Sequence, residues 1–245
     1  MGKDASLNPA LSVVVPVYNE EESLRPLFDA LVPVLRELDK PFEIILVDDG
    51  STDGSAALMD KLRREQAGVR VIRHRSNYGL SAAMATGFQA ARGEVVATMD
   101  ADLQNDPRDL PLLLSKLSGA DAVVGWRHQR HDPPVKRLSS RIANWIRNRA
   151  IHDGIHDTGC SLKVFRRDAI AKIRMFKGMH RFLPALLQME GCRVLEVKVR
   201  HHPRRYGKAK YHLTNRLLGP VCDLLAVRWM RRRALAIESE ETGEP

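Results

Sequence analysis

Two aspartates separated by one residue, Asp100 and Asp102, follow a short apolar run over residues 93–98. This run is rich in β-branched residues, which predicts a buried strand. Side chains two positions apart on an extended chain lie on the same side, so the two carboxylates are expected to converge where the strand ends. Carboxylates held together repel each other unless a cation neutralises them, and a hard divalent cation does so best. The spacing therefore predicts a divalent-cation site, with a solvated acidic turn as the alternative.

Basic residues are concentrated in three parts of this chain, whose formal net charge is +9. Residues 126–150 hold seven Lys and Arg against one acid, and residues 198–216 hold seven against none. A third group, Arg228 and Arg231 to Arg233, precedes a Glu-rich end. Such a field suits phosphorylated substrates, an anionic membrane surface or nucleic acid. Because aromatic residues make up only 5% of the chain and no nucleic-acid-binding motif is present, we expect phosphate and membrane rather than nucleic acid.

The composition is that of a globular protein. A length of 245 residues suits one α/β domain with a full core, alone or with an appendage. The three cysteines, Cys160, Cys192 and Cys222, are far apart and have no metal-ligand spacing, which favours a reducing compartment without structural disulfides or zinc. No apolar segment precedes Leu11, so we expect no signal peptide.

Strand and helix patterns alternate along most of the chain. Strands are expected at residues 11–17, 42–47, 69–73, 93–98, 121–127 and 194–200. Helices are expected at about 24–35, 55–66, 80–92, 108–118 and 213–230, the last too short and too broken to span a bilayer. This alternation predicts a Rossmann-like α/β fold, a mostly parallel sheet with helices on both faces and ligands at the carboxyl ends of its strands. The polar motifs follow those ends.

Motifs over residues 11–211 resemble a known family. Val-Pro-Val-Tyr-Asn-Glu at 15–20, Val-Asp-Asp-Gly-Ser at 47–51, Asn-Tyr-Gly at 77–79 and Asp-Ala-Asp-Leu-Gln at 100–104 look like family 2 glycosyltransferases. That resemblance implies a glycosyltransferase A-type fold. The motifs at 124–127, 157–167 and 204–211 are similar to the polyprenyl-phosphate branch, which includes dolichyl-phosphate mannosyltransferase and bacterial undecaprenyl-phosphate glycosyltransferases. In the last motif Ala209 stands where a serine is common, and the transmembrane helices that follow it in many relatives are not seen.

The resemblance implies binding residues for a nucleoside-diphosphate sugar and a metal. Asp100 and Asp102, with Gln104, would hold Mg²⁺ or Mn²⁺ against the donor diphosphate. The nucleotide-sugar pocket would be formed by Pro16, Tyr18, Glu20, Asp48, Asp49, Asn77, Gly79, Asp100, Ala101 and Asp102. Structural alternatives remain for several of these residues. Either Asp48 or Asp49 would only close its own turn, and Tyr18 would lie in the core. Residues 77–79 would only begin a helix, and the Gln104 amide would only cap the following turn.

Three residues are candidates for catalysis: Asp157, Arg127 and Arg204. Asp157 stands where a general base is usual, but a polyprenyl phosphate is already anionic and needs little proton abstraction. Two roles therefore remain open for Asp157: a base, or a group that orients the acceptor or a basic residue. Guanidinium groups suit phosphate oxygens and stabilise a departing diphosphate. The candidates for the acceptor phosphate are Arg127, Arg130, Arg141 and Lys210, with a solvated basic face as the alternative. Gly207 would let the loop that carries Arg204 close over a ligand.

We therefore expect a metal-dependent, inverting glycosyltransferase, peripheral on the cytoplasmic face of a membrane, that transfers a hexose to a polyprenyl phosphate. Its catalytic domain would cover residues 1–211, followed by an interfacial amphipathic helix at 212–235 and an acidic tail at 236–245. Its partners would be a nucleoside-diphosphate sugar, a polyprenyl phosphate and the membrane, which it would reach either by lying on the anionic surface or through a small membrane-anchoring protein. Two alternatives remain: a family 2 transferase with a saccharide or lipid hydroxyl as acceptor, and a non-catalytic basic scaffold that binds membranes.

Overall fold

The structure, a computed structural model, describes residues 8–128, 134–204 and 218–234. Within these residues a single sheet is formed by strands β1 (Leu11–Val17), β2 (Phe42–Asp48), β3 (Val69–Arg73), β4 (Val95–Thr98), β5 (Ala122–Arg127), β6 (Lys163–Arg166) and β7 (Val194–Val199). Their order across the sheet is β3-β2-β1-β4-β6-β5-β7. Strand β6 runs antiparallel to β4 and β5, and every other neighbouring pair is parallel. The expected mostly parallel sheet is confirmed.

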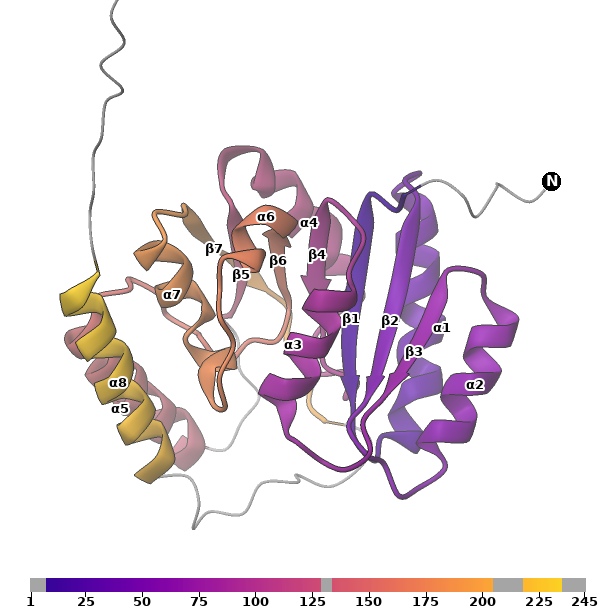
Figure 1. Cartoon of the computed structure of the whole chain (residues 1–245), viewed down its shortest axis with the longest axis horizontal. Helices are drawn as coiled ribbons and strands as arrows, with labels where there is room; N and C mark the ends of the chain where they lie inside the picture. Colours follow the sequence, from indigo (N-terminus) through magenta and orange to yellow (C-terminus); the bar gives the residue numbers. More distant parts are fainter. Residues whose placement is uncertain (1–7, 129–133, 205–217, 235–245) are drawn as a thin grey trace, which may run out of the picture.

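Helices cover both faces of this sheet (Figure 1). They are α1 (Glu21–Glu37), α2 (Ser55–Glu65), α3 (Leu80–Ala90), α4 (Leu110–Lys116), α5 (Pro134–Ile151), α6 (Arg167–Ala171), α7 (Leu183–Met189) and α8 (Leu218–Arg233). Short 3₁₀ turns lie at Pro107–Asp109, Leu117–Gly119 and Met179–Arg181. Helices α1, α2 and α4 contribute to one core, and α3, α6 and α7 to the other.

Strand β1 shows why the sheet is covered twice. Val13 and Val15 belong to the core beneath α1, whereas Val14 between them belongs to the core beneath α3. Successive side chains of a strand point to opposite faces, and a run of β-branched residues fills both. In α1, five apolar residues at helical spacing are all buried: Leu24, Leu27, Phe28, Leu31 and Leu35. The hydrophobic pattern therefore predicts both the elements and the faces that they bury.

Strand β6 is missing from the sequence prediction. It has only four residues, with a charged residue at each end, so it carries no alternation long enough to recognise. Val164 and Phe165 are nevertheless fully buried between β4 and β5. Because β6 is antiparallel, its amino end lies at the edge where β4 and β5 have their carboxyl ends. The residues before β6 therefore reach the edge of the sheet that is expected to bind ligands.

Helix α8 lies beside α5 at one end of the molecule (Figure 1). Its Val227 is fully buried, and Leu224 packs against the core beneath α3. Residues 213–217 of the expected helix, the expected domain boundary after 211 and the tail at 236–245 lie outside the described residues. Among those that are described, no helix combines the length and hydropathy needed to cross a bilayer. One side of α8 is thus packed on the protein.

Candidate active site

The candidate site lies where β1, β2 and β4 end. Strand β1 stands between β2 and β4, and the order of the strands reverses there, which opens a crevice for ligands in folds of this class. Register brings the ends together, since Val17 pairs with Asp48 and Val14 pairs with Thr98. Most of the expected nucleotide-sugar residues lie in the last two residues of these strands or just after them: Pro16, Tyr18, Glu20, Asp48, Asp49, Asp100, Ala101 and Asp102.

Asp100 and Asp102 lie close enough to perturb each other. Burial raises the pKa of Asp100 to about 6, and the charge of Asp102 contributes to the rise. Lys163, Ser161 and Arg127 oppose it. Two hard carboxylate groups whose charges repel fit a divalent cation such as Mg²⁺ or Mn²⁺. Among the described residues, no cluster of three or more His, Cys, Asp or Glu side chains accompanies them.

The loop after β4 turns sharply between Asp102 and Gln104. The Asp102 carboxylate accepts a 3.1 Å hydrogen bond from the Gln104 N–H, so a backbone group closes the turn. Leu103 between them has a φ of +58°, in the left-handed region that costs a side-chain-bearing residue about 1–2 kcal/mol. The chain tolerates this strain in the loop that carries the paired carboxylates.

Ser161, just before β6, fastens this loop from the other side. Its Oγ accepts hydrogen bonds from the Asp100 N–H at 3.1 Å and from the Asn105 side-chain amide at 2.7 Å. Its carbonyl accepts a 2.6 Å hydrogen bond from the Thr98 hydroxyl. Ser161 was not singled out from the sequence, although it belongs to the motif at 157–167. Its contacts join residues that are about sixty positions apart, and no local pattern signals such a pair.

Arg204 reaches the carboxylate pair from the segment after β7. Its Nη2 donates to the Asp102 Oδ2 at 2.7 Å, and its Nη1 lies 3.7 Å from the Glu20 Oε1. The structure therefore brings together three of the sequence-predicted residues from the ends of three different segments. A guanidinium group in this place neutralises acidic side chains and presents donors that suit phosphate oxygens.

The segment that carries Arg204 is anchored alongside the loop after β4. His201 forms an antiparallel bridge with Asn105, and the His202 N–H donates to the Gln104 carbonyl at 2.9 Å. Arg200 donates to the Asp109 carboxylate from its backbone N–H at 2.7 Å and from its Nε at 2.8 Å. The position of Arg204 therefore depends on the same loop that positions Asp102.

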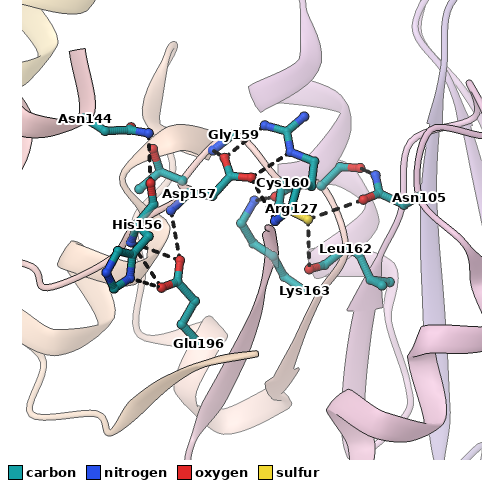
Figure 2. Close-up of polar contacts among 12 residues, drawn as sticks. Asn105, Arg127, Asn144, His156, Asp157, Gly159, Cys160, Leu162, Lys163 and Glu196 are labelled. Atoms are coloured by element: carbon teal, nitrogen blue, oxygen red, sulfur yellow. Dashed lines mark hydrogen bonds and ion pairs between the residues drawn. The ribbon is translucent and has the colours of Figure 1, made fainter. Parts of the chain in front are cut away.

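Arg127 and Asp157 form a two-point ion pair (Figure 2), and the charge of Arg127 also acts on Asp100. Arg127 Nε donates to Asp157 Oδ2 at 2.7 Å, and Arg127 Nη2 donates to Oδ1 at 2.9 Å. The backbone N–H groups of Arg127 and Gly159 donate to the same carboxylate at 3.2 and 3.1 Å. Because both oxygens of Asp157 accept hydrogen bonds, its geometry is that of a group that orients Arg127.

Two further residues that the sequence does not predict as site residues, Glu196 and Lys163, support this pair. Glu196 on β7 accepts hydrogen bonds from the backbone N–H groups of His156 and Asp157 at 3.0 and 2.9 Å (Figure 2). Lys163 donates to the Cys160 carbonyl, and burial lowers the pKa of its amine. Lys163 belongs to the motif at 157–167 but carries no site prediction there, and Glu196 belongs to no motif.

Asp48 and Asp49, at the carboxyl end of β2, both hold backbone loops. Asp48 accepts a 2.9 Å hydrogen bond from the Ser51 N–H, which closes the turn. This contact matches the alternative that one of these two aspartates closes its own turn. Asp49 accepts from the N–H groups of Tyr78 and Gly79 at 2.9 and 2.8 Å, and contacts His74 at 2.7 Å. The Gly79 amide is therefore engaged with Asp49 at the start of α3.

A glycine makes the contact between these two loops possible. Gly50 has a φ of +74°, and a Cβ there would lie 2.6 Å from the Ser76 carbonyl carbon. A larger residue would both strain the turn and push the loops apart. Asn77 of the second loop is exposed.

The remaining expected cations cannot be placed. Arg130 and Lys210 lie outside the described residues, as does the side chain of Arg141 on α5.

Comparison with known proteins decides the family. The chain matches the sequence profile of Glycosyl transferase family 2 over residues 12–174. It belongs to that family. A dodecaprenyl-phosphate galacturonate synthase of Rhizobium johnstonii is 39% identical over 228 residues, covering 91% of this chain and 67% of that protein.

Other family 2 relatives are similar over nearly the same span. An undecaprenyl-phosphate 4-deoxy-4-formamido-L-arabinose transferase of Pectobacterium atrosepticum is 38% identical, covering 88% of this chain and 66% of that protein. A protein of the same name from Pseudomonas aeruginosa is 39% identical, covering 88% and 64%. This family 2 chain thus spans about two thirds of the length of these curated relatives.

Solved structures agree on the fold. Glucosyl-3-phosphoglycerate synthase of Mycobacterium tuberculosis, in complex with Mn²⁺, uridine diphosphate and glucosyl-3-phosphoglycerate, aligns with a TM-score of 0.66 at 18% identity, covering 93% of this chain and 81% of that one. Its complex with Mg²⁺ and uridine diphosphate aligns with a TM-score of 0.67, also at 18% identity and with the same coverage. The glycosyltransferase A-type fold expected for this family 2 chain is confirmed.

Proposed function

We propose that this chain transfers a sugar, a hexose or a related sugar, from a UDP- or GDP-linked donor to the phosphate of a polyprenol, with inversion at the anomeric carbon. The observation that carries the proposal is the convergence of the Asp100–Asp102 pair with the guanidinium groups of Arg204 and Arg127. The two carboxylates suit a metal ion that would bind the diphosphate leaving group. The two guanidinium groups suit the phosphate oxygens of that leaving group and of an anionic acceptor. The names of the relatives, which act on dodecaprenyl or undecaprenyl phosphate, support that acceptor class.

In this reaction an acceptor phosphate oxygen attacks the anomeric carbon from the side opposite the nucleoside diphosphate. Arg204 would bind the diphosphate and stabilise its growing charge, and Arg127, oriented by Asp157, would bind the acceptor phosphate. Asp100 and Asp102, with Gln104 as a further candidate, would hold Mg²⁺ or Mn²⁺, which supplies Lewis-acid neutralisation of the diphosphate when bound. The mycobacterial neighbours were solved with these two metals.

An acceptor with a hydroxyl group is the second candidate. It needs a base to remove the hydroxyl proton, and Asp157 would have to fill that role. The bidentate contact with Arg127 favours the phosphate acceptor instead, because a carboxylate held at both oxygens is placed to orient a cation. Replacement of Asp157 by Asn distinguishes the two: abolished turnover would indicate a base, and weakened turnover an orienting group. The non-catalytic scaffold is disfavoured, since the chain belongs to a transferase family and retains the carboxylate pair.

The helices α5 and α8 support a position on the membrane surface. Of the nine most exposed large hydrophobic side chains in the described part of the chain, seven lie on these two helices: Ile142, Trp145, Ile146, Val221, Leu225, Trp229 and Met230. Exposed arginines accompany them: Arg149, Arg228, Arg232 and Arg233. Apolar side chains at helical spacing with arginines beside them suit the interface of an anionic membrane. We propose the cytoplasmic face of that membrane, with or without a small anchoring partner protein.

Incubation with polyprenyl phosphate and a panel of nucleotide sugars tests the function. The panel should contain UDP- and GDP-linked hexoses, together with the galacturonate and formamido-arabinose donors suggested by the names of the relatives. Mass spectrometry of the lipid fraction is expected to show one sugar added to the polyprenyl phosphate in the presence of Mg²⁺ or Mn²⁺. Transfer to a saccharide or lipid hydroxyl, with no polyprenyl product from any donor, would overturn the proposed acceptor.

A further inference from the structure

Glu196 is a partly buried acid that no motif of the sequence includes. Its side chain is 10% exposed, and it lies on β7 opposite Val124 of β5. The carboxylate accepts hydrogen bonds from the backbone N–H groups of His156, at 3.0 and 3.1 Å, and of Asp157, at 2.9 Å. It also contacts His156 Nδ1 at 2.7 Å. One side chain therefore holds two consecutive residues of the segment that delivers Asp157.

Trp126 holds the same segment from β5. Its ring stacks on the His156 ring, with the centroids 4.3 Å apart and the planes at 14°. Trp126 follows Val124 by two residues, and Val124 pairs with Glu196, so Trp126 and Glu196 project from the same face of the sheet. His156 is thus fixed by a stacked ring and by a carboxylate that belong to two adjacent strands.

These contacts fix the backbone from which Asp157 reaches Arg127. The Asp157 N–H is bound by Glu196, and its carboxylate is bound by Arg127 at 2.7 and 2.9 Å (Figure 2). We infer that Glu196 is a positioning residue: it sets the place of Asp157 and, through it, the orientation of the Arg127 guanidinium. The inference rests on the proposed function insofar as Arg127 serves the acceptor phosphate.

The charge and shape of Glu196 are both needed for this role. An ionised carboxylate accepts at two oxygens, whereas a glutamine amide accepts at one and turns two N–H donors toward the backbone N–H groups that it should bind. Glu196→Gln therefore removes part of the contact and adds a mismatch while it keeps the size of the side chain. Glu190→Gln is the matched control, because it makes the same change at an exposed acid just before β7.

A double-mutant cycle in the full chain tests the inference. Glu196→Gln is expected to lower kcat for polyprenyl phosphate about 10- to 100-fold, the scale of a misplaced catalytic group, with the KM for the donor unchanged. In an Asp157→Asn background the same substitution should change kcat by less than about twofold, because coupled residues are not additive. A purely structural Glu196 would instead give effects that multiply, or a loss of donor binding in parallel, and either result would overturn the inference.

Hydrogen exchange supplies a readout that needs no substrate. The amides of His156 and Asp157 should exchange faster in Glu196→Gln than in the wild type or in Glu190→Gln, and unchanged protection would overturn the inference. If the wild type forms no lipid-linked sugar with any donor, the proposed function fails, and this measurement still decides the role of Glu196. If Glu196→Gln does not fold, Glu196→Asp keeps the charge but draws the oxygens back by about 1.5 Å, and the same faster exchange and coupling are expected.

Discussion

Arg204 donates to Asp102 at 2.7 Å and lies 3.7 Å from Glu20, so one cation spans acids that follow two different strands. A nucleoside diphosphate bound at this edge would bring further negative charge to the same guanidinium group. In the proposed reaction this contact would matter most when that charge grows, which is in the transition state of sugar transfer. Arg204 should therefore affect the rate more than it affects donor affinity.

Arg204→Ala is expected to lower kcat by about 100-fold or more, with the KM for the donor changed by less than about threefold. Arg204→Lys should recover part of the loss, since an ammonium keeps the charge but not the two-pronged geometry. Steady-state kinetics with the donor varied at saturating acceptor measure both constants. An unchanged kcat with a raised donor KM would contradict the transition-state role.

Asp102→Asn addresses the paired carboxylates. It should lower activity by at least about 100-fold, because an amide is a poor ligand for a hard cation and several kcal/mol of charge stabilisation would be lost. Calorimetric titration of Mn²⁺ in the presence of the nucleoside diphosphate should show weaker binding. Asp29→Asn, at an exposed acid on α1, is the control for loss of one charge. Near-normal turnover of Asp102→Asn in added Mn²⁺ would rule out the metal assignment.

The sequence predicts the residues of this site unevenly. Asp100 and Asp102 are found by their spacing, and Arg204 by its motif, and the structure places all three at one edge. Glu196 and Ser161 are not found, since each acts through backbone groups about forty or sixty positions away. A single Glu in an alternating strand, or a single Ser before one, has many ordinary explanations, and only the folded chain shows what it holds.

Elements whose hydrophobic pattern extends over many residues can be predicted from the sequence, whereas very short elements cannot. Strand β1 has seven residues, four of them valines, and its two faces fill two cores. Strand β6 has four residues, so its place between β4 and β5 depends on pairing with distant strands. Tertiary context overrides local preference in such segments. The parallel sheet was therefore predicted from the sequence, whereas the reversed strand that brings Asp157 and Ser161 to the site was not.

Glu43 on β2 shows how the elements at the opposite edge of the sheet are tied. Burial opposes its ionisation, but hydrogen bonds from Ser12, Arg70 and the Arg92 N–H outweigh burial and hold the pKa of Glu43 below its usual value. These donors come from β1, from β3 and from the residues after α3. A depressed pKa in the folded state contributes stability above the unfolded-state pKa of about 4.3 and loses it as the pH falls through the folded-state value.

Glu43→Gln is therefore expected to lower the free energy of unfolding at pH 7 by about 1–3 kcal/mol, the scale of hydrogen bonds to a charged group. The difference from the wild type should shrink as the pH falls below about 4, where the carboxylate of the wild type takes up a proton. Urea denaturation at several pH values measures it. A difference that stays constant down to the acid limit would show that ionisation of Glu43 does not stabilise the sheet.

At the scale of the whole molecule, helices α5 and α8 form one surface that exposes both arginine and large apolar side chains. The sequence predicts an interfacial amphipathic helix at 212–235, and the structure shows that the two sides of α8 differ. Val227 is buried against the core, whereas Trp229 is 63% exposed. Trp145 on the neighbouring helix is 69% exposed. One side of the helix pair is thus left for a partner surface.

Replacing Trp145 and Trp229 together by serine should weaken binding to anionic vesicles about tenfold or more, since each large apolar side chain contributes about 1.5–3 kcal/mol when buried. Binding of the wild type should also fall in high salt, because part of it is screened attraction of the arginines. Vesicle flotation measures both effects, with Leu112→Ser on α4 as the control for loss of an exposed apolar residue. Equal flotation of the double variant and the wild type would exclude this surface as the membrane contact.

Helix α5 carries Trp145 on its exposed side and, two residues later, the buried Arg147, which donates to Thr158 at 2.6 Å in the segment of Asp157. On a bilayer, this single helix would be the partition between the lipid interface and the acceptor side of the site. A helix with its side chains is about 10–12 Å across, so a polyprenyl phosphate would need to raise its headgroup by roughly that distance while its hydrocarbon chain stays among the lipids. Acceptor and product would then diffuse in two dimensions along the membrane. Of the two substrates, only the nucleotide sugar would arrive by three-dimensional diffusion from solution.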